Sequence, residues 1–468
     1  MSFYRKMCLC LCLILLLQMF IVPSFADDET TDISVLNGCR GFDAKVPVLG
    51  VTQLVENVQS AFVYEVGTGS LIYAWNPDQQ LFPAGLVKIL TALVAIENGN
   101  LAAAVTVKES VLDELSKNTR TSKLQADEVF TLEQLLYLVL VEGSNDASVV
   151  VADHIAGNQE SFVNMMNTFA QDLGCTNSHF TNVHGLHDDQ QLSTARDVAR
   201  ILSRAIQNEQ FSKMFGTTHY DMPATNKSKE RQLESSNHLM HQSLYEIYYD
   251  ERVTGGRTGV NTLGLQSIVT TAQQDDMQVV CVVMGSASKI NDRAIVEKIG
   301  GFDETSQLLD QAFGSFRPAQ LLFDGQTLKQ YSVRNGIADV VVGPNISVSA
   351  VVPADETKGT LSYQYKDIDS AFEAPVKKGQ QMSVVEIWCG SVCLAQAPLY
   401  ALNDVDVNYQ QVEYKGGAGI PWWGVLLIIL LVLLLAAVGY VFFKRYQNLR
   451  AVSSKRRPTR VGHNGRRA

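Results

Sequence analysis

The order of short strands and longer helices predicts an α/β fold, a sheet covered by helices, followed by a small all-β domain. Between about residues 51 and 315, strand-like runs stand at both ends and helical runs lie between them. That order builds one sheet with helices packed on it. From residue 316 to about 410 helical periodicity is absent, and short β-branched or alternating runs such as Ile346–Val352 predict strands. We therefore expect two folded domains that meet near residue 315.

The α/β domain is predicted to begin with a hairpin and to continue with helices. Ser60–Val66 and Ser70–Trp75 flank a glycine-containing turn, as the strands of a hairpin do. Pro83 then opens a helix, where its missing N–H costs nothing, and Asn98-Gly99 closes it. The later elements follow the same patterns: helices at Leu132–Val141, Asp146–Ala156, Ser161–Leu173 and Ala294–Phe313, and strands at Leu265–Thr271 and Gln278–Met284.

Both ends of the chain carry apolar segments that predict membrane targeting. Residues 1–26 have a short basic start, an apolar run and a small-x-small site at Ser24–Ala26, which is typical of a signal peptide; an uncleaved anchor helix is the alternative. Residues 422–443 are uncharged and apolar, and 22 residues of helix span about 33 Å, the thickness of a bilayer core. A buried soluble helix is the alternative for this segment. Residues 27–50 precede the first domain, and 411–421 form a glycine-rich linker.

Charge is divided unevenly along the chain. The tail 444–468 holds nine Lys or Arg and no acid, so the positive-inside rule places it in the cytoplasm. The segment between signal and span has 27 Lys and Arg against 48 Asp and Glu, a formal charge of −21. Nucleic-acid binding needs a basic face, so we expect no such partner.

Cysteine is too sparse for a disulfide scaffold. Cys281 lies in the apolar run Met277–Met284 and is expected to be an inert core thiol. Cys389 and Cys393 flank a three-residue turn, a spacing that permits a disulfide between them and equally permits two free thiols. The sequence has no metal-ligand pattern, and we expect no metal and no cofactor.

Three motifs stand in an order that suits acyl transfer by a serine. Such chemistry needs a nucleophile, a neighbouring base, a proton relay and a cation for the substrate carboxylate. Gly85 and Lys88 hold positions i and i+3 at a helix start, which share one face. Asn145 lies between two predicted helices, and Arg257-Thr258-Gly259 lies just before the strand at Leu265.

This arrangement resembles the D-alanyl-D-alanine carboxypeptidases, the low-molecular-weight penicillin-binding proteins, whose motifs are Ser-x-x-Lys, Ser-x-Asn and Lys-Thr-Gly. The resemblance covers about residues 51–315, and the following β-domain also fits. Five further segments agree with the family: Thr91–Glu97, Asn145–Ala147, Phe162–Asn167, Phe180–Leu186 and Ser193–Asp197. The resemblance implies a site with these roles: Gly85 at the vacant nucleophile position, Lys88 as base, Gly143 at the vacant relay position, Asn145 beside it, and Arg257, Thr258 and Gly259 for substrate binding.

The departures from the family remove two hydroxyls and keep the groups that hold substrate. Glycines stand at 85 and 143, Ser144 takes the middle place of the second motif, and Arg257 replaces a lysine. Arginine keeps the charge and offers a fork for a carboxylate; a solvated arginine is the alternative. Lys88 has no hydroxyl to deprotonate, and the favoured interpretation is a buried cation hydrogen-bonded to Asn145. Ser144 is expected to point away from the relay position, and His184 and His187 are expected to be structural.

Loss of a serine nucleophile costs on the order of 10⁶ in turnover. We therefore predict a membrane-anchored bacterial pseudoenzyme that binds peptidoglycan stem peptides, or a cell-wall synthesis protein, through the old cleft. The alternative is a working serine-type D-Ala-D-Ala carboxypeptidase that uses a displaced nucleophile or a water activated by Lys88. A β-lactamase would need the same missing serine. Departures in all three motifs favour natural divergence over a single engineered knockout at Gly85.

Overall fold

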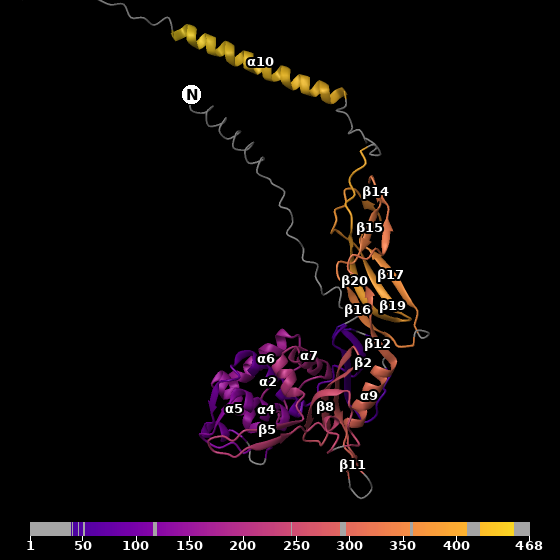
Figure 1. Ribbon diagram of the computed structural model, residues 1–468. Helices are drawn as coiled ribbons and strands as arrows, with labels where there is room; N and C mark the ends of the chain where they lie inside the picture. The colour runs from indigo at the N-terminus through magenta and orange to yellow at the C-terminus, as the bar shows by residue number, and fades with distance from the viewer. Residues whose placement is uncertain are drawn as a thin grey trace, which may run out of the picture.

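The computed structural model describes residues 39, 41–44, 46–49, 52–115, 119–244, 246–290, 296–355, 359–409 and 422–453. The predicted signal peptide, the linker 411–421 and the end of the basic tail lie outside these residues. An α/β domain ends at Ser315 and an all-β domain begins at Phe316, so that the two stack end to end (Figure 1). The predicted fold class is confirmed.

A five-stranded antiparallel sheet forms the base of the first domain. Its order is β2-β1-β9-β8-β7, which places the first and last strands of this sheet, β1 and β9, side by side. The strands are β1 (Ser60–Glu65), β2 (Ser70–Trp75), β7 (Val253–Val260), β8 (Gln266–Gln274) and β9 (Met277–Ser286). The predicted hairpin and both predicted late strands are present, and β7 lies at one edge of the sheet.

Alternating residues of the central strands face two different helical layers. On β9, Val280 and Val282 belong to the large core under the helical layer, whereas Val279, Cys281 and Val283 face α9 (Phe302–Ser315) on the other side. Period-two alternation of this kind lets one strand serve two cores. Burial raises the pKa of the Cys281 thiol to about 12, as expected for an inert core cysteine.

The helical layer is built around one buried helix, α2 (Val87–Asn98), in which every residue from Val87 to Ala95 is buried. It begins after a 3₁₀ turn, η2 (Ala84–Leu86), for which Pro83 is the N-cap residue. The other elements of this layer are α4 (Leu132–Tyr137), the π-helix η3 (Leu138–Glu142), α5 (Asn145–Ala156), α6 (Gln159–Asp172), α7 (Ala195–Ala205) and α8 (Glu209–Phe215). Short elements complete the domain: α3 (Glu109–Leu112), β3 (Ala104–Thr106), β4 (Val129–Thr131), β5 (His219–Met222), β6 (Arg231–Glu234), η4 (His238–Met240), β10 (Lys289–Ile290) and β11 (Val296–Lys298).

One predicted helix was placed wrongly. The prediction began it at Ala294, but β11 occupies Val296–Lys298 and α9 begins only at Phe302. Gly301, at φ +90°, is its N-cap residue, and its N–H donates to the Glu304 carboxylate. A left-handed glycine that precedes an acidic residue at the third helical position fixes the start of this helix.

The second domain consists of strands around one apolar core, as predicted. Its main sheet has the order β13-β15-β20-β19-β17, with β13 (Lys329–Tyr331), β15 (Val340–Gly343), β17 (Leu361–Asp367), β19 (Gln381–Cys389) and β20 (Val392–Ala401). Two smaller pairs cover its core, namely β12 (Phe316–Leu322) with β16 (Val348–Pro353) and β14 (Val333–Arg334) with β18 (Phe372–Glu373).

The disulfide that the sequence permits between Cys389 and Cys393 does not form. Cys393 is bonded to Cys39, 354 residues away, and Cys389 is a free, half-buried thiol. In the hairpin register Cys389 is paired with Val392 and Cys393 with Trp388. Adjacent cross-strand pairs direct their side chains to opposite faces, so the two thiols point away from each other.

A single long helix, α10 (Trp422–Ser453), follows the β-domain. Its segment Trp422–Arg445 is long and apolar enough to cross a membrane, by length and composition, and none of that segment is buried within the protein. The helix overlaps the predicted span of residues 422–443.

Candidate active site

The turn that should carry the nucleophile is bent and closely packed. Ala84 adopts a left-handed backbone, at φ +47°, immediately before Gly85. Such a conformation costs an L-residue roughly 1–2 kcal/mol, and strained backbone tends to gather at functional sites. The turn leads directly into α2, which carries Lys88 one helical turn beyond Gly85.

Lys88 is a buried amine held by two acceptors. Its side chain is 2 % exposed, and Nζ donates to Oδ1 of Asn145 over 2.7 Å and to the backbone carbonyl of His184. Burial, and then the positive charges of Arg257 and Arg120, hold the pKa of Lys88 well below its ordinary value, while Asp146 acts in the opposite sense. The expected hydrogen bond from Lys88 to Asn145 is present, whereas burial disfavours the charged form of this amine, which was predicted to be a cation.

The second motif lies where the π-helix η3 ends and α5 begins. Gly143 closes η3 in a left-handed conformation, at φ +83°. Ser144 is the N-cap residue of α5: its fully buried Oγ accepts from the N–H of Ala147 over 3.2 Å and donates to Asp146. The Ser144 hydroxyl is thus used in capping rather than directed at the relay position.

Arg257 on β7 points into the protein, not into solvent. Its side chain is 3 % exposed, and Nη1 donates to the carbonyls of Leu140 and Val141 at 3.3 and 3.4 Å. Among the described residues its buried Nε has no hydrogen-bond partner. Burial, and then the charge of Arg120, lowers the pKa of Arg257 to about 9. The guanidinium therefore hydrogen-bonds to the end of η3 and is not solvated, and its role as a fork for a substrate carboxylate stays a prediction.

The two glycines of the site are each matched to a neighbouring group. A Cβ placed on Gly143 would overlap the guanidinium of Arg257. A Cβ placed on Gly85 would lie 2.7 Å from the carbonyl oxygen of Thr258 and 3.3 Å from Cα of Gly259. Because both atoms near Gly85 belong to the backbone of β7, they cannot rotate aside, and the turn η2 rests directly on the strand.

A hydroxyl pair lies next to these groups and was not predicted. Ser236 Oγ and Thr258 Oγ1 are 2.8 Å apart, and Arg257 Nη1 lies 3.5 Å from Ser236 Oγ. Arg120 was also missed; its carbonyl accepts from the N–H of Asn145 over 2.9 Å. Nothing in the local sequence pattern marks Ser236 or Arg120 as a site residue, because each comes close to the site only when the chain folds.

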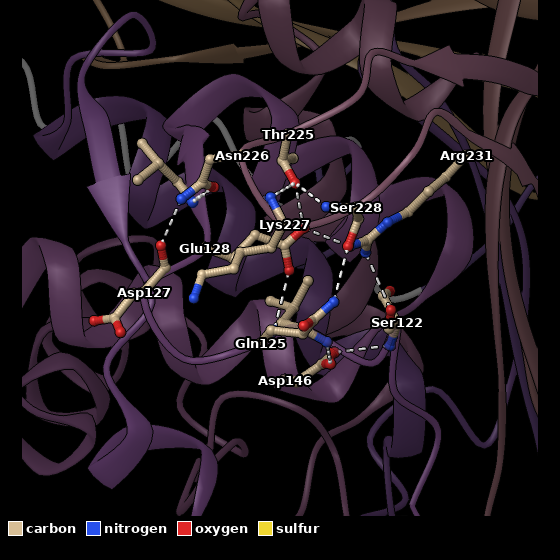
Figure 2. Close-up of polar contacts among 12 residues, drawn as sticks. Ser122, Gln125, Asp127, Glu128, Asp146, Thr225, Asn226, Lys227, Ser228 and Arg231 are labelled. Carbon is tan, nitrogen blue, oxygen red and sulfur yellow. Dashed lines mark hydrogen bonds and ion pairs between the residues drawn. The ribbon is translucent and has the colours of Figure 1, made fainter.

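The segment after Arg120 is fixed to the start of α5 and to the β5–β6 hairpin, as Figure 2 shows. Asp146 accepts from the N–H groups of Ser122 and Leu124, both at 3.0 Å. On the other side the fully buried Glu128 pairs with Arg231 over 2.6 Å, and Arg231 also donates to the carbonyl of Ser122 over 3.1 Å. This network holds the loop against the second motif.

Beside η2 there is an open pocket of about 170 Å³. It is lined by Phe82–Ala84, Gly185–Asp188, Gln191 and Val260–Thr262, so it borders both the nucleophile turn and the end of β7. Phe82 and His187 meet edge to face, with ring centroids 4.6 Å apart. The pocket is thus a mixed apolar and polar recess next to the place where Gly85 meets β7.

Each of the two domains matches a known protein family. The family described as D-alanyl-D-alanine carboxypeptidase matches residues 50–288, and that described as penicillin-binding protein 5, C-terminal domain, matches residues 316–407. The chain is 26 % identical over 358 residues to D-alanyl-D-alanine carboxypeptidase DacF of Bacillus subtilis, covering 76 % of this chain and 87 % of the relative. It is 28 % identical over 356 residues to DacC of Escherichia coli, covering 73 % and 82 %. The solved structure of penicillin binding protein 5 from Haemophilus influenzae matches with a TM-score of 0.61 and 26 % identity, over 76 % of this chain and 100 % of that one.

Proposed function

Because this chain belongs to the D-alanyl-D-alanine carboxypeptidase family, we propose that it is a pseudoenzyme that binds peptidoglycan stem peptides ending in D-Ala-D-Ala without cleaving them. It acts at the cell surface of a bacterium, anchored by α10, with its two folded domains outside the cytoplasm. Cell-wall synthesis proteins are the partner class that fits this location.

The contact between Gly85 and β7 carries the proposal. A serine here needs room for a Cβ, and that atom would lie 2.7 Å from the Thr258 carbonyl. A serine side chain therefore fits only if η2 and β7 separate, and the loss of a serine nucleophile by itself removes about 10⁶ in rate.

Binding rests on the pocket beside the turn and on the edge of the sheet. β7 is the last strand in its sheet, and η2 rests on it at Thr258 and Gly259, so we expect an extended peptide to lie at the exposed end of β7 with its side chains in the adjoining recess. Val260, at the end of β7, lines the pocket and is 58 % exposed. Because Arg257 is turned toward η3, the peptide carboxylate is not gripped as the family's lysine motif would grip it, and we expect weak affinity.

The alternative is residual hydrolysis, and one observation favours it. The pKa of Lys88 is held well below its ordinary value by burial, which favours the neutral amine, the form that can act as a base. The Ser236–Thr258 pair supplies hydroxyls within the same site. Hydrolysis requires η2 to move away from β7 and so depends on a rearrangement of the backbone.

Three measurements on the detergent-solubilised full chain separate the two functions. After incubation with a penicillin, intact mass is expected to show no adduct, and no D-alanine is released from a pentapeptide. Calorimetric titration is expected to show binding of a stem pentapeptide ending in D-Ala-D-Ala and not of the same peptide ending in L-Ala-L-Ala. A stable acyl adduct or released D-alanine would overturn the pseudoenzyme assignment, and absence of peptide binding would overturn the binding role.

A matched pair of variants locates the binding surface. Val260→Arg places a charge at the mouth of the pocket and is expected to abolish peptide binding. Leu263→Arg changes a more exposed residue three positions later, 72 % exposed and outside the pocket lining, and is expected to leave binding unchanged. Equal effects of the two variants would show that the recess is not the binding surface.

A further inference from the structure

The N-terminal segment of the described chain runs between the two domains. Its residues 46–49 follow the outer edge of β2, where the N–H groups of Val48 and Leu49 donate to the carbonyls of Leu71 and Ile72 over 3.1 and 2.9 Å. Val48 packs against the core of the β-domain and also against the core between the sheet and α9. The described residues of this segment, 39, 41–44 and 46–49, lie near the junction of the domains (Figure 1) and are called the strap below.

The other end of the strap is fixed to helix α7. Phe42 stacks on Tyr64 of β1 with ring centroids 4.1 Å apart, and its carbonyl accepts from Arg196. Asp43 pairs with Arg200, whose guanidinium also lies over the Phe42 ring. The strap therefore belongs structurally to the α/β domain, even though its first described residue is bonded to the other domain.

That first residue is Cys39, and its disulfide partner Cys393 lies near the start of β20. The α/β and β-domains have further links near this place. The chain passes directly from α9 into β12 at Ser315–Phe316, the buried N–H of Val351 donates to Oγ of Ser70 over 3.0 Å, and the N–H of Ala354 donates to the carbonyl of Ser315 over 2.9 Å. The side chain of Val351 is also buried in the core between the sheet and α9. These links lie at β12 and β16, whereas the disulfide adds a second covalent crossing at the β19–β20 hairpin.

We propose that the Cys39–Cys393 disulfide, acting through the strap, fixes the orientation of the β-domain on the α/β domain, so that the two form one rigid arm between the membrane helix and the site. With the disulfide formed, the strap is anchored at both ends, and Val48 is held as a wedge between the two cores. With the disulfide reduced to two thiols, the strap is anchored only to α7 and β2, and the β-domain turns about residues 315–316. The inference does not depend on whether the site cuts or only binds.

The spare thiol of Cys389 provides a built-in control. It lies on the same hairpin as Cys393 but on the opposite face, and it is half-buried and unpaired. A non-reducing digest of the full chain is therefore expected to link the Cys39 peptide to the Cys393 peptide and to leave Cys389 open to alkylation. A link between Cys389 and Cys393 would overturn the proposal.

Hydrogen exchange then tests the mechanical role. In Cys39→Ser, the amides of Val48, Leu49 and Val351 are expected to exchange about tenfold faster, because the elements that protect them open independently of the rest. Amides of β9 are expected to keep their rates, and Cys389→Ser is expected to match the wild type throughout. If Cys39→Ser does not fold, the folded wild type is reduced and alkylated instead, and the same amides are measured. Unchanged exchange at the strap and at Val351 after loss of the disulfide would show that the domains are held without it.

Discussion

Gly85→Ser restores the residue type of the family's nucleophile, and the structure predicts that this substitution destabilises the protein. The new Cβ would lie 2.7 Å from the Thr258 carbonyl oxygen and 3.3 Å from Cα of Gly259, so η2 and β7 must separate by several tenths of an ångström. Forcing extra atoms into a packed region costs about 1–3 kcal/mol. For a domain of this size such a loss lowers the thermal midpoint by roughly 3–9 °C.

The assay compares Gly85→Ser with Gly314→Ser, in which a Cβ meets no atom within 4 Å. Thermal unfolding followed by circular dichroism should show the decrease only in Gly85→Ser. Intact mass after penicillin treatment should show no adduct, because Gly143 also lacks its hydroxyl. Two results would refute the reasoning: an unfolding midpoint equal to that of the wild type, or robust release of D-alanine by the single variant.

Three further predictions concern the groups around the site. Gly143→Ser should lower the free energy of unfolding by about 1–3 kcal/mol, because the new side chain overlaps the Arg257 guanidinium. Adding Arg257→Lys should recover at least about 1 kcal/mol in a double-mutant cycle measured by denaturant unfolding. Strictly additive effects of the two substitutions would contradict this. Burial, and then Lys88, lowers the pKa of His184 to about 3, so its neutral form is favoured in the folded state. The stability that this residue contributes is fully present above about pH 6.5 and falls toward pH 3, by about 2 kcal/mol at pH 5. His184→Asn should remove this loss from the pH profile of the free energy of unfolding. Glu128→Ala leaves the Arg231 cation without its buried carboxylate and should cost about 3 kcal/mol in chemical denaturation, and a loss below about 1 kcal/mol would show that the pair is not important for stability.

Local pattern was sufficient for elements whose side chains follow one clear period. The strands of the first hairpin were predicted within one residue, and the helix predicted from Pro83 to Asn98 is present as η2 followed by α2, because alternation and helical spacing are both strong there. Helix α7 was not predicted as an element, although its N-cap Thr194 accepts from the N–H of Asp197 over 3.1 Å. Its start signal was visible in the sequence, but it was taken only as part of a family resemblance.

For the site, motif spacing predicted which residues come together, but not how their side chains are directed. Motif order brought Lys88, Asn145 and Arg257 together, and the structure places them in one cluster of charge and hydrogen bonds. The direction of Arg257 was not predictable, since it depends on the free carbonyls of a π-helix that no sequence signal announced. The disulfide partner of Cys393 was likewise hidden, because a partner 354 residues away leaves no local trace.

The retained lysine has a structural explanation that does not need catalysis. Lys88 joins three elements, since α2 carries it, Asn145 begins α5, and His184 belongs to the loop that borders the pocket. Without the lysine, two buried acceptors would be left unpaired, at about 1–3 kcal/mol for each. The two hydrogen bonds of Lys88 avoid this cost and so offset part of the penalty for burying the amine. The same amine would be needed as a base if the serine were present. Retention of Lys88 therefore does not distinguish an active from an inactive site, whereas the contact of Gly85 with β7 bears on it directly, because a side chain at the nucleophile position requires η2 and β7 to separate.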